Sequence, residues 1–193
     1  MSDLALDPKT TALVVIDLQR GIVARPTGPH AAADVVARAA ALTNAFGDAG
    51  ATVVLVNVAF AKDRRDLLQP PVDSPNPPHQ PPAEWSQLVD ELRPRESDLR
   101  ITKHQWGAFY GTELDLQLRR RGVRTVVLCG IATNFGVEST ARDGWERGYQ
   151  IVFAEDAMSG LTEDAHRFAV TTIFPRLGRV RSTEQILLSF RKK

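Results

Sequence analysis

The stretch T-V-V-L-C-G-I-A-T-N-F-G-V-E-S-T-A-R-D-G-W-E-R-G-Y, from Thr125 to Tyr149, decides the fold. Its first part, Val126–Cys129, is a short apolar run rich in β-branched residues, which predicts a buried strand. Gly130 interrupts the run, and from about Phe135 the pattern becomes helical. A strand that turns sharply into a helix leaves unpaired backbone N–H groups at the helix start, where an anion can bind. The turn alone is equally compatible with a plain connection.

Five further segments read as strands and alternate with helical patterns. They are Ala12–Ile16, Thr52–Val58, Leu99–Thr102, Ile151–Ala154 and Arg179–Arg181. The longer ones are continuous apolar runs without alternating polarity, which is typical of strands buried on both faces of a parallel sheet. The sequence therefore predicts an α/β fold: a doubly wound, Rossmann-like, six-stranded parallel sheet with helices on both faces, in three αβα layers.

Composition limits the class of protein. The chain has 193 residues, a formal net charge of +1 and 43% hydrophobic residues, so we expect one domain over residues 1–193. Neither nucleic acid nor a membrane is expected as a partner, because no strong basic balance exists. Cys129 is the single cysteine, so no intramolecular disulfide can form. With no apolar signal core near the start and no run long enough to span a bilayer, we expect a soluble cytoplasmic protein.

A proline-rich segment over residues 62–83 interrupts the alternation. It holds most of the 12 prolines of the chain, which excludes a helix or a central strand. A loop of this length is either a disordered insert or a functional lid or contact arm. We favour an ordered arm, because prolines lower the entropy that is lost when a segment docks.

Two chemically capable side chains stand at predicted strand ends. Asp17 follows the first strand and Lys103 follows the third, while the Gly130–Gly136 turn follows the fourth. Ligands of open parallel sheets bind beyond the carboxyl ends of the strands, where the strand order reverses. Burial raises the pKa of a carboxyl group and a nearby ammonium lowers it, so such a pair can serve as a tuned acid or base. The alternative is a structural ion pair or a helix cap.

Three spaced motifs resemble those of one known family. They are V-V-I-D-L-Q around Asp17, I-T-K-x-x-W-G-A-F-Y-G-T-x-L around Lys103, and L-C-G-I-A-T-N-F-G-V-E-S-T-A-R-D after Val127. Together they resemble the isochorismatase-like hydrolases, and most closely an uncharacterised bacterial subgroup. The family includes nicotinamidases, N-carbamoyl amino-acid amidohydrolases and isochorismatases. The resemblance implies a six-stranded parallel sheet, a site built from the Asp, the Lys and the turn after strand four, and a non-proline cis peptide at Ile131–Ala132.

One position departs from the amidase members of that family. Where they carry a cysteine nucleophile, this chain has Gly136, and Cys129 lies inside the predicted strand as a buried thiol. Isochorismatases proper resemble the chain in having glycine there, and their Asp protonates an enol-ether carbon before water attacks. They tend to carry Ala-His where this chain has Thr133 and Asn134. The resemblance therefore favours hydrolysis without a covalent intermediate and leaves the substrate open.

The histidines give no sign of a metal site. The nicotinamidase-type zinc site resembles Asp-x-His after strand two, but the corresponding segment here, residues 57–62, contains no histidine. The four histidines show no ligand spacing; they are His30, His79, His104 and His166. We predict no catalytic metal and no other cofactor. His104 follows Lys103 and either faces the cleft or lies solvated in the loop.

Several residues are candidates for the walls of the site. Trp106, Phe109 and Tyr110 could form an aromatic shelf for a planar or cyclic substrate, or alternatively a hydrophobic plug or a subunit contact. By the resemblance, Asn134 and Phe135 line the site beside Gly136. The backbone at Ile131 and Ala132 belongs to the anion-stabilising turn in the same way.

The leading hypothesis is a cofactor-independent hydrolase that acts on a small metabolite, with an enol-ether bond as one possibility. Asp17 would be the general acid/base, Lys103 its electrostatic partner, and the turn with Gly136 the anion-stabilising element. The alternatives are a binding or scaffold protein that kept the fold, and a residual amidase that uses an activated water. By resemblance we expect a homo-oligomer, either a dimer or a tetramer.

Overall fold

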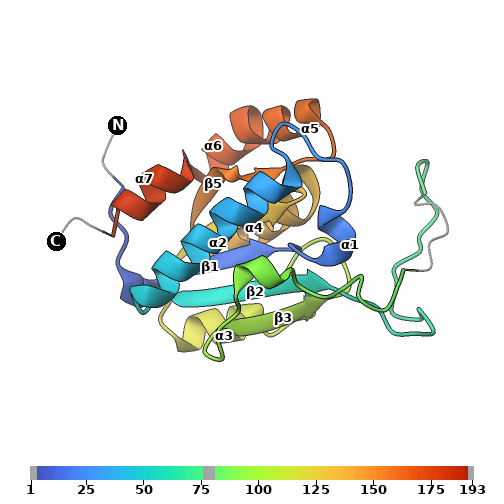
Figure 1. Cartoon of the computed structure of the whole chain (residues 1–193), viewed down its shortest axis with the longest axis horizontal. Helices are drawn as coiled ribbons and strands as arrows, with labels where there is room; N and C mark the ends of the chain where they lie inside the picture. Colours follow the sequence, from blue (N-terminus) through green and yellow to red (C-terminus); the bar gives the residue numbers. More distant parts are fainter. Residues whose placement is uncertain (1–3, 76–80, 191–193) are drawn as a thin grey trace.

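The structure is a computed structural model that describes residues 4–75 and 81–190. Its centre is a six-stranded parallel sheet with the strand order β3-β2-β1-β4-β5-β6 (Figure 1). The strands are β1 (Thr11–Ile16), β2 (Thr52–Val58), β3 (Leu99–Lys103), β4 (Thr125–Ile131), β5 (Gln150–Ser159) and β6 (Gly178–Arg181). The predicted fold class is confirmed.

Helices cover both faces of the sheet, because successive strand side chains point to opposite sides. Leu13 and Val15 belong to one core cluster, and Val14 and Ile16 belong to the other. The first cluster includes side chains of α2 and α7, and the second includes side chains of α3, α4 and α6 (Figure 1). The α-helices are α1 (Arg20–Val23), α2 (Ala32–Asp48), α3 (Leu114–Arg120), α4 (Glu138–Glu146), α5 (Glu163–Phe168), α6 (Phe174–Leu177) and α7 (Thr183–Leu188).

Five-residue π-helical turns and short 3-10 turns complete the chain. The π-helical turns η3 (Thr133–Val137) and η4 (Ala169–Ile173) lead directly into α4 and α6. The 3-10 turns are η1 (Pro8–Thr10) and η2 (Asp90–Leu92). Within residues 4–75 and 81–190, no helix is both long and apolar enough to cross a membrane.

The strand order reverses between β1 and β4, as the doubly wound pattern predicts. Ile16 at the end of β1 is in register with Gly130 of β4. Gly130 has φ of 121°, and a Cβ there would lie 2.0 Å from the carbonyl oxygen of Ile16. Only glycine fits this close approach. The sequence indicated that Gly130 interrupts the strand. That prediction was wrong, because β4 continues through Gly130 to Ile131.

The proline-rich segment leaves the sheet after β2 and returns before η2 (Figure 1). Its return end is anchored, since Trp85 O accepts hydrogen bonds from Gly21 N at 3.0 Å and from Gln19 Nε2 at 3.1 Å. Leu68 and Val72 within it are exposed. Residues 76–80 lie outside the described residues, so the prediction of an ordered arm over residues 62–83 stays a prediction.

Candidate active site

Asp17 and Lys103 form a buried ion pair beyond the carboxyl ends of the strands. Lys103 Nζ donates a hydrogen bond to Asp17 Oδ2 at 2.7 Å, and both side chains are almost fully buried. Lys103 comes from β3, whereas Asp17 follows β1, so the lysine side chain spans the end of the intervening β2. The structure thus brings together the two residues that the strand ends indicated.

The backbone at Asp17 has an unusual conformation that its hydrogen bonds hold in place. Asp17 has φ of 54°, in the left-handed region that few non-glycine residues adopt. Its N–H donates to Val56 O at 2.9 Å, and its carbonyl accepts from Gln19 N at 2.8 Å. Residues held in such a conformation require support from their surroundings, and they gather at functional sites.

The carboxyl group of Asp17 has an unusual protonation equilibrium. Burial raises its pKa from 3.8 to about 6, and the charge and hydrogen bond of Lys103 offset only part of this effect. Asp17 Oδ1 is buried without a hydrogen-bond partner among the described residues. Buried polar atoms of this kind are rare, and a substrate or water can supply the missing partner.

Two backbone carbonyls complete the surroundings of the ammonium group. Lys103 Nζ donates to Trp106 O at 2.7 Å and to Gln105 O at 3.2 Å. With the Asp17 carboxylate, these account for all three ammonium donors. The lysine is therefore held in one position by the loop that follows β3.

The turn after β4 closes over this ion pair. The peptide bond between Ile131 and Ala132 is cis, at the position that the resemblance implies. In the π-helical turn that follows, a Cβ placed on Gly136 would lie 3.0 Å from Asp17 Oδ2 and 3.3 Å from Lys103 Nζ. Position 136 is thus in direct contact with the ion pair, and no side chain is present there.

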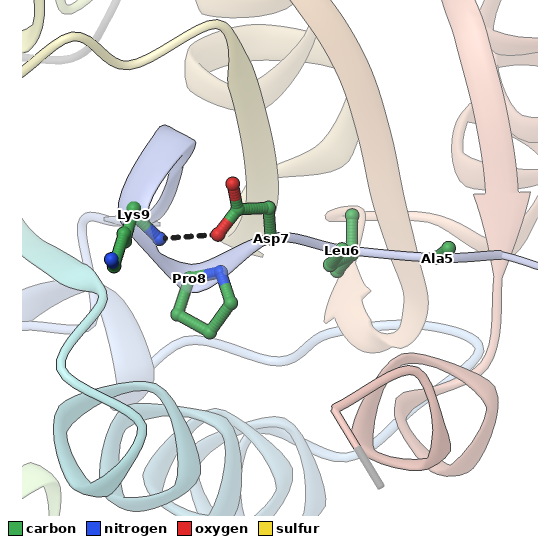
Figure 2. Close-up of a pocket in the computed structure, with 5 residues that line it drawn as sticks. All are labelled: Ala5, Leu6, Asp7, Pro8 and Lys9. Atoms are coloured by element: carbon green, nitrogen blue, oxygen red, sulfur yellow. Dashed lines mark hydrogen bonds between the residues drawn. The ribbon is translucent and has the colours of Figure 1, made fainter. Parts of the chain in front are cut away.

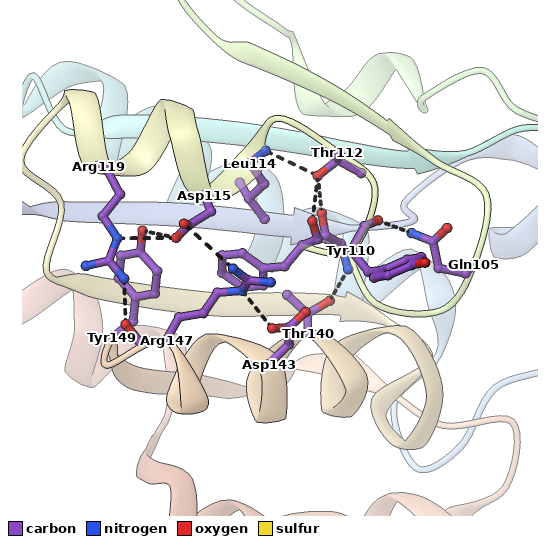
Figure 3. Close-up of polar contacts among 12 residues, drawn as sticks. Gln105, Tyr110, Thr112, Leu114, Asp115, Arg119, Thr140, Asp143, Arg147 and Tyr149 are labelled. Carbon is purple, nitrogen blue, oxygen red and sulfur yellow. Dashed lines mark hydrogen bonds and ion pairs between the residues drawn. The ribbon is translucent and has the colours of Figure 1, made fainter.

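A threonine joins the two loops around the site. Thr140 Oγ1 on α4 donates to Gly136 O at 2.7 Å and accepts from Ala108 N at 3.1 Å. Figure 3 shows Thr140 between α4 and the loop that carries Gln105 and Tyr110. The turn after β4 and the loop after β3 are therefore fixed to each other.

The neighbours of Gly136 separate into two environments. Thr133 is fully buried, and its Oγ1 lies 2.8 Å from His166 Nδ1. Asn134 is partly buried, and its Oδ1 has no hydrogen-bond partner among the described residues. Asn134 therefore offers a second free acceptor on the turn that contains Gly136.

The aromatic residues after Lys103 do not form one shelf. Trp106 is exposed and its ring meets the Phe135 ring edge to face, with centroids 4.9 Å apart. Phe109 instead lies in the core and stacks on Tyr149, so the prediction that it lines the site was wrong. The Phe109 ring packs against α4, where a Cβ on Gly144 would lie 3.1 Å from Phe109 Cε2. Tyr110 is exposed, and its contribution to the site stays a prediction.

Cys129 is a buried structural thiol, as the sequence indicated. It is fully buried in β4, and burial raises the pKa of the thiol from 9.0 to about 12. A thiol in this environment is inert, because the thiolate is the nucleophile.

Two histidines that looked unrelated in the sequence share one carboxylate. His30 Nε2 and His166 Nε2 lie 3.1 and 3.2 Å from Glu155 Oε1. The spacing gave no signal, because 125 and 11 residues separate the histidines from Glu155. His104 lies elsewhere, with Nδ1 2.7 Å from Ala59 O and 3.4 Å from Asp66 Oδ2.

One surface groove is unrelated to these residues. It is lined by the segment Ala5–Lys9, in which Lys9 N donates to Asp7 Oδ1 at 3.0 Å (Figure 2). None of the predicted site residues lines it, and we attach no function to it.

Known proteins are similar to this chain over most of its length. Residues 11–185 match the family described as Isochorismatase domain. The chain is 52% identical over 184 residues to the uncharacterised isochorismatase family protein YecD of Escherichia coli O157:H7, covering 95% of this chain and 98% of that protein. It is 34% identical over 204 residues to the ureidoacrylate amidohydrolase RutB of Methylobacterium radiotolerans, covering 88% and 75% of the two chains.

A solved structure is similar along its whole length. An isochorismatase family protein from Burkholderia thailandensis superposes with a TM-score of 0.94 at 45% sequence identity, covering 99% of this chain and 100% of that chain. The chain belongs to the isochorismatase-like hydrolase family.

Proposed function

We propose that this protein is a hydrolase that cleaves an enol-ether bond in a small, anionic metabolite by acid–base chemistry, without a cofactor. Asp17 is the general acid/base and Lys103 its electrostatic partner. The observation that carries the proposal is the Asp17 carboxyl group, which is buried beside an ammonium group, has a pKa of about 6 and keeps one oxygen free. A group with a pKa near neutrality can both give and take a proton at working pH.

The reaction begins with proton transfer from the Asp17 carboxyl group to the terminal carbon of the enol ether. The C–O bond acquires oxocarbenium character, and the carboxylate that forms is stabilised by Lys103 Nζ at 2.7 Å. Water then attacks the oxocarbenium carbon and returns its proton to the carboxylate. The resulting hemiketal collapses to a ketone and an alcohol, so atoms and protons balance and Asp17 is again protonated.

The absence of a side chain at Gly136 supports a route without a covalent intermediate. A nucleophile at this position would have its Cβ 3.0 Å from Asp17 Oδ2, so its reactive atom would stand beside the ion pair. With glycine there, no nucleophilic side chain stands beside the ion pair. The free acceptor on Asn134 and the exposed Trp106 ring are the proposed contacts for the rest of the substrate.

The experiment measures pyruvate release from isochorismate and ammonia release from an N-carbamoyl amino acid. The expected result is pyruvate release by the wild type and its loss by at least about 100-fold in Asp17→Asn, since a positioned general acid contributes 10²–10⁴-fold. Asp90→Asn is the matched control, because it makes the same chemical change at an exposed aspartate paired with Arg20. Ammonia release without pyruvate would instead establish the amidase alternative.

Turnover of neither compound would extend the test to other small enol ethers. The Thr133-Asn134 pair already distinguishes this chain from isochorismatases proper, so a different ring is compatible with the proposal. A folded wild type that is inactive on the whole series would favour the binding or scaffold alternative.

The proposal includes self-association. Exposed apolar side chains occur on the proline-rich segment and on the loop after β3; they are Leu68, Val72, Trp106 and Tyr110. Aromatic side chains such as those of Trp106 and Tyr110 are enriched in protein interfaces. Light scattering coupled to size-exclusion chromatography is expected to give a dimer or a tetramer, and a monomer at micromolar concentration would contradict this.

A further inference from the structure

A cluster of metal-ligating side chains lies behind the turn after β4. It consists of His30 from the segment before α2, Glu155 from β5 and His166 from α5, and we call it the His30–Glu155–His166 cluster. One potential ligand atom from each residue lies within 4.8 Å of the other two. Neither Asp17 nor Lys103 belongs to it, and the proposed reaction does not use it.

The backbone holds the three residues in place from different directions. His30 N donates to Ser159 Oγ at 3.2 Å, and the His30 carbonyl accepts from Thr27 Oγ1 at 2.8 Å. Gly28 and Gly160 exchange two backbone hydrogen bonds of 3.0 Å, which tie this segment to the end of β5. These contacts hold the His30 segment beside the end of β5.

The separations between Glu155 Oε1 and the two histidine nitrogens are compatible with a tetrahedral metal ion. Bonds of about 2.1 Å to nitrogen and oxygen ligands place neighbouring ligand atoms roughly 3.4 Å apart in a tetrahedron. The observed separations from Glu155 Oε1 are 3.1 Å to His30 Nε2 and 3.2 Å to His166 Nε2. Two imidazoles and one carboxylate form a ligand set that zinc takes readily, with a fourth position for water.

Solvent can reach the cluster from one side. The side chain of His166 is 3% exposed, whereas those of His30 and Glu155 are 24% and 32% exposed. An ion would therefore reach the cluster on the side of His30 and Glu155. His166 forms the closed end of the site.

We propose that the His30–Glu155–His166 cluster binds one divalent zinc-type cation through His30 Nε2, His166 Nε2 and a carboxylate oxygen of Glu155.

Thr133 supports the metal-bound state of His166. Metal-bound histidines use one ring nitrogen as ligand and donate the other N–H to an oxygen. His166 Nδ1 lies 2.8 Å from Thr133 Oγ1, so Nδ1–H donates to this hydroxyl when Nε2 carries the metal. Without metal, Nε2–H donates to Glu155 and Nδ1 accepts from the same hydroxyl. A hydroxyl both donates and accepts, so the change needs no rearrangement.

The site has a structural consequence for the turn after β4. Thr133 is the first residue of η3, the turn that also contains Gly136. A cation held by His166 would therefore fix the start of this turn through Thr133. The cation is a positioning element, distinct from the Asp17–Lys103 pair.

The test uses the full chain, freed of metal with a chelator and then dialysed. Zinc chloride is titrated in by calorimetry, and the bound metal is counted by mass spectrometry after gel filtration. The expected result is one zinc ion per chain, with a dissociation constant in the micromolar range or below. In a second titration cobalt(II) replaces zinc as a spectroscopic probe, because tetrahedral cobalt(II) absorbs visible light intensely.

Variants assign the ligands. His30→Ala, at a partly exposed loop position, should weaken zinc binding at least about 100-fold and abolish the cobalt absorption. Thr133→Val should weaken binding about 10- to 100-fold, because it removes the partner of His166 Nδ1. His104→Ala is the matched control, since His104 also faces a carboxylate, that of Asp66, but lies outside the cluster.

Three results would overturn the proposal. The first is a wild type that binds zinc no tighter than about 1 mM. The second is equal zinc affinity in the wild type and in His30→Ala. The third is an equal loss of affinity in His30→Ala and His104→Ala. His30 is chosen over the buried His166 because its replacement leaves the core intact.

Discussion

The Asp17→Asn variant tests whether the pKa of the Asp17 carboxyl group is raised by burial, as a general acid requires, or lowered by the ion pair, as in a purely structural contact. The folded protein keeps the Asp17 proton up to about pH 6, whereas the unfolded chain releases it near the ordinary value of 3.8. Between these two values the folded state binds more protons than the unfolded state. The free energy of unfolding of the wild type therefore falls as pH rises through this window. The Asp17→Asn variant lacks this titration and the corresponding slope.

The size of the effect follows from the shift in pKa. At 1.36 kcal/mol per pKa unit, the shift from 3.8 to about 6 corresponds to roughly 3 kcal/mol. The stability difference, wild type minus Asp17→Asn, should thus be most positive below pH 4 and decrease by roughly 3 kcal/mol by pH 7. Roughly 2 kcal/mol of this decrease falls above pH 4.5, where unfolding is simple to measure.

The assay is urea unfolding of both proteins at half-unit steps from pH 4.5 to 7.5, followed by tryptophan fluorescence. Asp90→Asn is the control, and its stability difference should stay within about 0.5 kcal/mol at every pH, because exposed ion pairs contribute little. A difference for Asp17→Asn that grows with pH would refute the reasoning. That result is the signature of a carboxyl group whose pKa is lowered by its ion pair.

Three further predictions concern neighbouring features. Gly136→Ala adds a methyl group 3.0 Å from a carboxylate oxygen of the buried ion pair. It should lower the free energy of unfolding, measured in urea, by about 1–3 kcal/mol and abolish turnover. The control is Gly107→Ala, where a Cβ meets nothing closer than 3.7 Å, and equal effects of the two variants would contradict the close contact at Gly136. Cys129 should resist iodoacetamide at pH 8 in the native protein and react only in urea, because burial raises the pKa of its thiol to about 12; rapid native labelling would show that β4 opens. Tyr149 lies in the link between α4 and β5, and its hydroxyl donates to Asp115 Oδ1 of α3 at 2.8 Å (Figure 3). Tyr149→Phe removes this hydroxyl and should lower the free energy of unfolding by about 1 kcal/mol; an unchanged value would mean that the contact does not stabilise the fold.

The sequence was sufficient for the fold and for the centre of the site. Apolar runs without alternation indicated strands buried on both faces. Asp17 stood at the end of such a run, and Lys103 stood at the end of the weaker predicted strand Leu99–Thr102. Because parallel strands end at one edge of a sheet, residues 86 positions apart could be placed together, and they form the 2.7 Å ion pair.

The directions of side chains in loops could not be predicted from the sequence. Phe109 follows Lys103 by only six positions, yet it packs in the core against Tyr149, whereas Trp106 remains exposed. An aromatic residue in the loop after a strand can pack in the core or remain exposed, and its position in the sequence does not distinguish the two. Only the three-dimensional path of the loop carries this information.

The histidine cluster was missed for a related reason. The sequence indicated that β5 ends at Ala154, but the strand continues to Ser159 and so places Glu155 within the sheet. His30 and His166 approach it from a loop and from a helix, 125 and 11 residues away. Metal ligands are recognisable in a sequence when they recur at short fixed spacings, and this set does not.

The most direct measurement of the central claim is the pH dependence of kcat/KM for pyruvate release from isochorismate or from the enol ether that the protein turns over. If the protonated Asp17 carboxyl group starts the reaction, activity stays level below about pH 6 and falls tenfold per pH unit above it, since the group loses its proton there. An activity that instead rises through pH 6 would show that the carboxylate acts first as a base, and it would contradict the proposed mechanism.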